Sequence, residues 1–268
     1  MPWALTERSL TEVRNLGLTI EKLLTTYNFS DRPAGSREIE YIVIHYFGSL
    51  GTAKAVANYF ASAYRGASAH YCVDDGDTAY QCVEDEDVAW HCGTSGTYYH
   101  PSCRNSNSIG IEVRPYKLDP STASSASVRD WYFTEQTVEN LVELTVSLMR
   151  KYNIPPERVI RHYDVTHKWC PRPWMGDDIN LYYGESGNAQ WKKFKERIEE
   201  ETQMRYNTMK EIEDGAGYAL PTVQKLVSLG YLQGSGKKDE DGYPADMNLS
   251  KDMLRILVIN DRAGLYEG

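Results

Sequence analysis

The chain has 268 residues, with 29 Lys and Arg against 38 Asp and Glu, which gives a formal net charge of -9. Because affinity for nucleic acids depends on Lys and Arg that neutralise phosphates, this balance argues against a nucleic-acid partner. Hydrophobic residues make up 41% and charged residues 25%, which are ordinary values for a chain that folds around a core.

The first elements in chain order are a leader and a buried strand. Residues 1–40 are interpreted as a leader that packs on the body. Four apolar residues at helical spacing predict a helix over 19–27: Ile20, Leu23, Leu24 and Tyr27. The nearly continuous apolar run YIVIH (41–45) predicts a buried strand.

Strands and helices then alternate. Residues 52–64 predict a helix with Thr52 as its cap, and 69–83 predict two strands around an Asp-Gly turn. SIGIEV (108–113) alternates as a strand does, and the Ser-rich segment 117–130 predicts a surface loop.

The remainder of the larger part completes a mixed sheet. A helix is predicted from Val138 to Tyr152, ended by two prolines, followed by a strand candidate over 157–164 and an amphipathic helix over 189–201. This alternation predicts the α/β (α+β) class, with a central mixed sheet covered by helices.

The character changes near residue 202. Two helical segments follow, 221–234 and 249–264, and each has start and stop signals: Pro221 with Gly230, and Ser250 with Gly264. We therefore expect two domains, 1–201 with the leader and a small helical module over 202–268.

Three residues in the larger domain suggest metal chemistry. His45 closes the first buried strand, His162 lies near the end of another, and Cys170 follows eight residues later. Two His and one Cys that leave a fourth position open would form a catalytic zinc site. The alternative is ordinary packing, because single His and Cys residues are often buried core residues.

The order of motifs adds a family resemblance. IVIHYFG, SAHYCVDD, AWHCG, NSNSIGIEV and RHYDVTHKWCP occur in the same order as the motifs of type 2 N-acetylmuramoyl-L-alanine amidases, particularly phage and prophage endolysins. The resemblance covers about residues 38–180. It implies the fold shared with peptidoglycan recognition proteins and a Zn²⁺ held by His45, His162 and Cys170, with Glu112 and Lys168 beside it. It also implies hydrolysis of the amide between N-acetylmuramic acid and L-alanine.

A non-catalytic peptidoglycan-binding protein is the alternative function. Cys170 argues against it, because the proteins of this fold that bind without cutting generally lack the cysteine ligand.

Two charged residues are candidates for the catalytic chemistry. Glu112 shares one strand face with Gly110, whereas the other face carries Ile109, Ile111 and Val113. The carboxylate of Glu112 therefore projects beside a residue without a side chain and suits a general base. The alternative is an ion pair with Arg114. Lys168 would lie on the side of the thiolate and stabilise an oxyanion, with an ordinary solvated lysine as the alternative.

The oxyanion role has a second candidate in His167, next to Lys168. Four further residues are predicted to line a groove for the glycan strand and stem peptide, with plain packing as the alternative: His70, His91, Trp90 and Tyr46.

The other cysteines are not assigned to the metal: Cys72, Cys82, Cys92 and Cys103. Cys92 and Cys103 flank a loop and are considered as a disulfide pair, although spacing does not determine pairing.

The compartment and the role of the C-terminal module follow from weaker signals. No run approaches the roughly 20 apolar residues of a membrane span, and the start lacks the basic-then-apolar order of a secretory signal. We expect synthesis in the cytoplasm and action on the wall after release by a holin or lysis. The C-terminal module is predicted to bind the wall, with packing or homodimer formation as the alternative.

Overall fold

The computed structural model describes residues 18–32, 39–93, 96–122, 129–203 and 205–266. Within these ranges the chain forms two compact units, 18–202 and 203–266, which are described separately. The predicted leader lies partly outside the described residues. No helix in the described ranges is long and apolar enough to cross a membrane.

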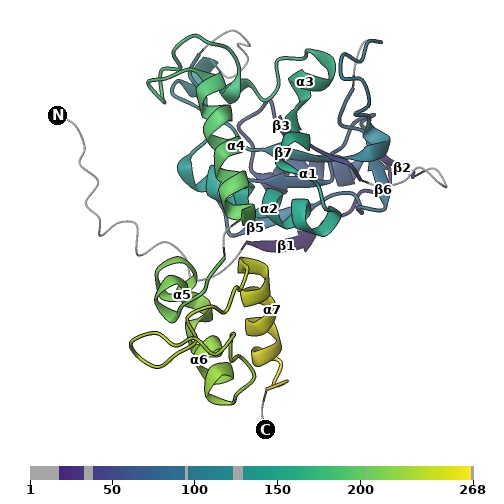
Figure 1. Ribbon diagram of the computed structural model, residues 1–268. Helices are drawn as coiled ribbons and strands as arrows, with labels where there is room; N and C mark the ends of the chain where they lie inside the picture. The colour runs from purple at the N-terminus through teal and green to yellow at the C-terminus, as the bar shows by residue number, and fades with distance from the viewer. Residues whose placement is uncertain (1–17, 33–38, 94–95, 123–128, 204, 267–268) are drawn as a thin grey trace. The chain divides into compact units, whose positions relative to one another are not determined.

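A six-stranded mixed sheet forms the centre of the first unit (Figure 1). All neighbouring strands are parallel except β4 and β5, which form the antiparallel pair predicted around the Asp-Gly turn. In spatial order the strands are β1 (Thr19–Lys22), β5 (Thr78–Gln81), β4 (Tyr71–Val73), β7 (Ser108–Val113), β3 (Tyr41–Tyr46) and β10 (Val159–Arg161).

The helices cover both faces of this sheet, which confirms the predicted fold class. Ile44 and Ile111 face a core built with α2 (Glu135–Tyr152) and α4 (Gly187–Gln203). The opposite face of β4 packs on α1 (Ala53–Ser62).

Shorter elements complete the first unit. The two small sheets are β2 (Phe29–Asp31) with β6 (Asp87–Ala89), and β8 (Tyr116–Lys117) with β9 (Trp131–Tyr132). The short helices are α3 (His162–Thr166) and the 3-10 turns Asn105–Asn107, Pro120–Thr122, Pro156–Arg158 and Arg172–Trp174.

The prediction of a helix over 19–27 is wrong. Residues Thr19–Lys22 form β1, which is the edge strand of the sheet and pairs in parallel with β5. Ile20 and Tyr27 are about half exposed, whereas Leu23 packs against the core beneath α1, so the four apolar residues do not form one buried helical stripe. Backbone pairing with a neighbouring strand therefore overrides the local helical pattern.

Two other predictions are corrected in part. The strand expected over 157–164 ends at Arg161, where the carboxylate of Asp164 accepts a hydrogen bond from the Arg161 backbone at 2.8 Å and starts α3. The predicted loop 117–130 lies partly outside the described residues. Its ends are joined by a buried ion pair, with Lys117 Nζ 3.3 Å from Asp130 Oδ1.

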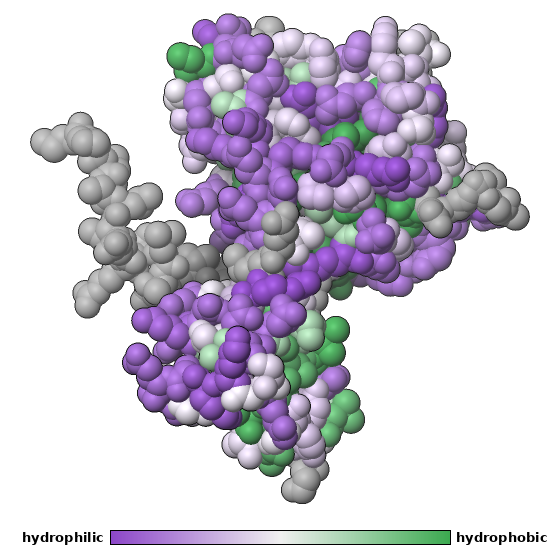
Figure 2. Space-filling model, in the orientation of Figure 1, coloured by the Kyte–Doolittle hydropathy of each residue, from purple (hydrophilic) through white to green (hydrophobic). Residues whose placement is uncertain are grey.

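The second unit is a small helical bundle. The two predicted helices are confirmed as α6 (Leu220–Ser228) and α7 (Lys251–Arg262), whereas α5 (Met209–Ala216) and the 3-10 turn Gly217–Ala219 were not predicted. The centre of its core holds Ile212, Val223 and Leu254 from the three helices. Apolar surface is visible on this unit (Figure 2), and its exposed apolar side chains include Leu229, Tyr231, Met253, Ile256, Ile259 and Leu265.

Candidate metal centre

Three side chains form a row across the first unit's sheet. Glu112 on β7 is the register partner of both His45 on β3 and Cys72 on β4. Because paired residues project from the same face of a sheet, the carboxylate lies between the imidazole and the thiol. This face is opposite to the one that packs on α2.

The three predicted ligands come together at one end of this row. His45 lies near the end of β3, His162 is the first residue of α3, and Cys170 lies in the loop after that helix. Their candidate ligand atoms all lie within 4.8 Å of one another, and the three residues are buried. The His45 Nδ1 atom is 3.8 Å from the Cys170 sulfur.

His162 presents a free lone pair to this group. Its Nε2 atom is 3.3 Å from the carbonyl oxygen of Gly93, which can only accept, so Nε2 carries the proton. The Nδ1 atom is then unprotonated, and it is buried without a hydrogen-bond partner among the described residues. Buried polar atoms without partners are rare, and a metal ligand atom would account for this one.

Burial keeps both histidines neutral. It lowers the pKa of His45 well below its usual value and lowers the pKa of His162 to about 4, with the charge of Lys168 contributing. Burial also raises the pKa of the Cys170 thiol. Neutral imidazoles are what a metal requires, and a cation would favour the thiolate form of Cys170.

Glu112 has the environment of a proton-transfer group. Burial raises its pKa to about 8, although the nearby Lys168 charge opposes this shift. The ion pair considered with Arg114 does not form, because the Arg114 guanidinium pairs with Asp75 at 3.2 Å. The Oε2 atom of Glu112 is buried and has no hydrogen-bond partner in the described part of the chain.

Lys168 and His167 occupy different environments. The charge of Lys168 acts on Glu112 and on the three candidate ligands. The His167 ring instead stacks face to face on Tyr99, with ring centroids 3.6 Å apart. Of the two candidates for the oxyanion role, Lys168 is therefore the one placed beside the ligands.

Residues 35–173 match the family model described as N-acetylmuramoyl-L-alanine amidase, which covers just over half of the chain. The chain belongs to this family. The matched range contains His45, Glu112, His162, Lys168 and Cys170.

Curated relatives carry the same name as the family. The N-acetylmuramoyl-L-alanine amidase CwlL of Bacillus licheniformis is 30% identical over 150 residues, which is 53% of this chain and 39% of that protein. The amidase BlyA of Bacillus subtilis is 28% identical over 148 residues, which is 52% of this chain and 38% of that protein. The chain spans about two fifths of the length of these curated relatives.

Solved structures also align with this amidase-family chain. A mutant endolysin from Bacillus subtilis is 25% identical, with a TM-score of 0.48, and covers 68% of this chain and 99% of that chain. The structure of PlyL is 22% identical, with a TM-score of 0.47, and covers 68% of this chain and 97% of that chain.

Two histidines predicted to line the groove are buried within the protein. His70 is fully buried, where its Nδ1 accepts a hydrogen bond from the Gly110 amide at 3.0 Å and its Nε2 faces the Asp87 carbonyl at 3.3 Å. His91 is also buried, between His45 and Ser108. Because their ring nitrogens are occupied by protein groups, the groove-lining prediction is corrected for both residues.

Trp90 and Tyr46 are half-buried near the site. The Trp90 indole donates a hydrogen bond to the Ser30 hydroxyl at 3.2 Å. The Tyr46 hydroxyl accepts one from Arg172 at 3.3 Å. Both residues are only partly buried, so a role in substrate contact stays a prediction for them.

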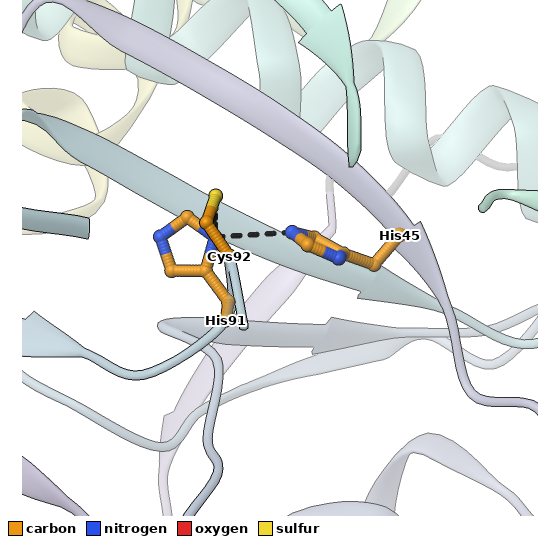
Figure 3. A group of neighbouring side chains, drawn as sticks. All are labelled: His45, His91 and Cys92. Carbon is orange, nitrogen blue, oxygen red and sulfur yellow. Dashed lines mark hydrogen bonds between the residues drawn. The ribbon is translucent and has the colours of Figure 1, made fainter. Parts of the chain in front are cut away.

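All five cysteines are free thiols, so the disulfide considered between Cys92 and Cys103 is not formed. The sulfurs of Cys72 and Cys82 lie 3.6 Å apart. Cys92 belongs to a second group of potential ligands, together with His45 and His91 (Figure 3). Sequence reasoning had not assigned this second group.

Proposed function

We propose that the first unit is a zinc-dependent amidase that cleaves the bond between N-acetylmuramic acid and L-alanine in peptidoglycan. The observation that carries this proposal is the convergence of His45, His162 and Cys170 within a chain segment that matches the amidase family. Three ligands that leave a fourth position open are typical of a catalytic zinc site.

The donor atoms fit zinc in type and spacing. Two imidazole nitrogens and a thiolate are preferred zinc ligands, at about 2.0 and 2.3 Å from the ion. Two atoms bound at those lengths in a tetrahedral site lie about 3.5 Å apart, which agrees with 3.8 Å between His45 Nδ1 and Cys170 Sγ. When bound, zinc would polarise the amide carbonyl and lower the pKa of water from about 15.7 to about 7.

The protein's own groups would then move the protons. Glu112 takes a proton from the attacking water and later returns it to the leaving amine of L-alanine. Its raised pKa suits both steps near neutral pH, because a group that must first accept and then donate works best with a pKa near the working pH. The Lys168 ammonium stabilises the oxyanion that forms on the substrate carbonyl.

An assay on isolated cell walls tests this function. The purified chain is incubated with peptidoglycan, with and without a chelator, and new L-alanine amino groups are counted. We expect their release from zinc-loaded protein and its loss with the chelator. If zinc-loaded protein sediments with the walls but releases no amino groups, the non-catalytic binding alternative replaces the amidase proposal.

For the second unit we propose cell-wall binding, with the whole chain acting on the wall after release by a holin or lysis. Exposed apolar side chains on α7, among them Ile256 and Ile259, support a binding role. The double variant Ile256→Asp/Ile259→Asp should sediment less with walls and keep a wild-type mass by light scattering. A dimeric wild type that the variant converts to a monomer would assign this surface to homodimer formation.

A further inference from the structure

The ring of His91 occupies a space that a glycine creates. It lies over Gly110 on β7, where an added Cβ would be 2.4 Å from the His91 Cγ atom. His91 Nδ1 is 3.0 Å from His45 Nε2, and the two rings meet edge to face (Figure 3). Gly110 therefore lets one imidazole pack directly against another that is a candidate metal ligand.

The donor and acceptor of each hydrogen bond in this region are assigned stepwise, starting from a backbone carbonyl that can only accept. The Arg104 carbonyl can only accept, so the Ser108 hydroxyl donates to it at 2.7 Å. Ser108 Oγ must then accept from His91 Nε2 at 3.2 Å, which leaves the His91 Nδ1 atom as an acceptor. His45 Nε2 consequently donates to His91, and the His45 Nδ1 lone pair faces Cys170.

The second histidine ligand is oriented by the same short segment. His162 Nε2 donates to the carbonyl of Gly93, two residues after His91. The segment 91–93 thus contacts the Nε2 atoms of both His45 and His162. Each contact leaves the opposite ring nitrogen, Nδ1, unprotonated.

We propose that His91 is a positioning residue that fixes the Nε2–H tautomer of His45 and aims its Nδ1 lone pair at the metal. The inference rests on the proposed metal role of His45, because a positioning residue needs a ligand to position. Partners of this kind, hydrogen-bonded to metal-bound histidines, typically contribute a 10- to 100-fold difference in metal affinity.

The hydrogen bonding of His91 argues against the second group of potential ligands as the metal site, because His45 Nε2 donates to His91 Nδ1 and both atoms are thereby occupied. His45 Nε2 and His91 Nδ1 are 3.0 Å apart, which is the length of a direct hydrogen bond. Two nitrogens bound to one tetrahedral zinc would lie at a similar distance of about 3.3 Å, so the donor and acceptor roles assigned above, and not the distance, separate the two groups. Cys92 Sγ, 3.2 Å from the same His91 nitrogen, acts as a weak second donor to it.

The first experiment reads the tautomers directly in the metal-free wild-type protein. Long-range nitrogen–proton NMR spectra distinguish Nδ1–H from Nε2–H imidazoles. We expect the Nε2–H form for His45, His91 and His162. A His45 ring that carries its proton on Nδ1 would overturn the proposal. Because the measurement uses the wild-type protein, it does not depend on the folding of a variant.

The second experiment measures zinc affinity by chelator competition. His91→Phe keeps a flat ring without nitrogens and should bind zinc about 10- to 100-fold more weakly than the wild type. His91→Asn places an amide oxygen near the Nδ1 position and should bind zinc more tightly than His91→Phe. A folded His91→Phe protein with wild-type affinity would contradict the proposal.

A control separates the two ligand groups and the two proposals. Cys92→Ser should keep zinc, whereas its loss would assign the metal to the second group and overturn this inference. If the tautomers and affinities are as expected but walls release no amino groups, the proposed amidase function fails and the positioning role stands. If the wild-type protein releases amino groups but His91→Phe binds zinc as tightly as the wild type, the amidase function stands and the positioning role fails.

Discussion

Glu112 and His45 are register partners on the adjacent parallel strands β7 and β3, so the candidate base and a candidate ligand project from the same sheet face side by side. The geometry of the backbone ladder fixes their separation. Neither residue depends on a loop for its position, which is the arrangement that keeps a reacting group aligned.

The first prediction concerns the base. Glu112→Gln removes the carboxylate but keeps the volume of the side chain. The rate at which L-alanine amino groups are released should therefore fall about 10²- to 10⁴-fold. Zinc content should stay at the wild-type level, because Glu112 is not one of the converging ligands. Kinetics and metal analysis of the same preparation check both parts. Wild-type turnover in this variant would remove Glu112 from the mechanism.

The second prediction concerns the thiolate ligand. Cys170→Ser replaces a zinc-preferring sulfur with a weakly acidic hydroxyl, so the zinc affinity and the rate of release of L-alanine amino groups should both fall. Cys103→Ser makes the same chemical change at another buried cysteine and should leave zinc affinity unchanged. Equal zinc affinities in the two variants would mean that Cys170 does not hold the metal.

The third prediction uses the space under His91. Gly110→Ala would place a methyl group 2.4 Å from the His91 ring, so the ring must shift from the position in which it contacts His45. Zinc affinity should fall to about the level of His91→Phe. Gly51→Ala meets only ordinary contacts, the nearest at 3.7 Å, and serves as the matched control. If Gly110→Ala binds zinc as tightly as this control, the position of the His91 ring does not affect zinc affinity.

The fourth prediction concerns the pH dependence of stability through the buried Asp85. Burial alone would raise the pKa of Asp85, but hydrogen bonds from Lys151, Tyr152 and Tyr71 outweigh it and lower the pKa. Its contribution to stability is therefore complete above the unfolded-state pKa of about 3.9 and is lost as pH falls through the lower folded-state value.

Asp85→Asn should accordingly lower the free energy of unfolding by about 2 kcal/mol at pH 7, because hydrogen bonds to a buried charge are lost. The difference from the wild type should shrink as the pH is lowered below about 4. Denaturant unfolding at both pH values checks this. A difference that is constant with pH would show that the charge of Asp85 does not stabilise the fold.

Local patterns in the sequence were sufficient for most of the sheet, whereas the candidate ligands were predicted from the order of motifs. His45, His162 and Cys170 each lie at the end of an element or just after one, and ordered motifs identify them although no local spacing relates them. The sequence also contains a start signal for α5, since Thr208 and Glu211 form a capping box.

The errors came from contacts that no local pattern encodes. The strand β1 forms because β5 offers a free edge, which outweighs the helical spacing of Ile20 and its neighbours. The absence of a side chain at Gly110 was visible in the sequence, but nothing there said that His91 fills the space. The role of His91 therefore emerges only when β7 and the 91–93 segment are placed together.

The central claim is tested most directly by titrating the metal-free chain with zinc while counting the L-alanine amino groups that it releases from isolated peptidoglycan. The account predicts no release without metal and a rate that rises until one zinc is bound per chain. Full release by the metal-free chain, or none at saturating zinc, would contradict it.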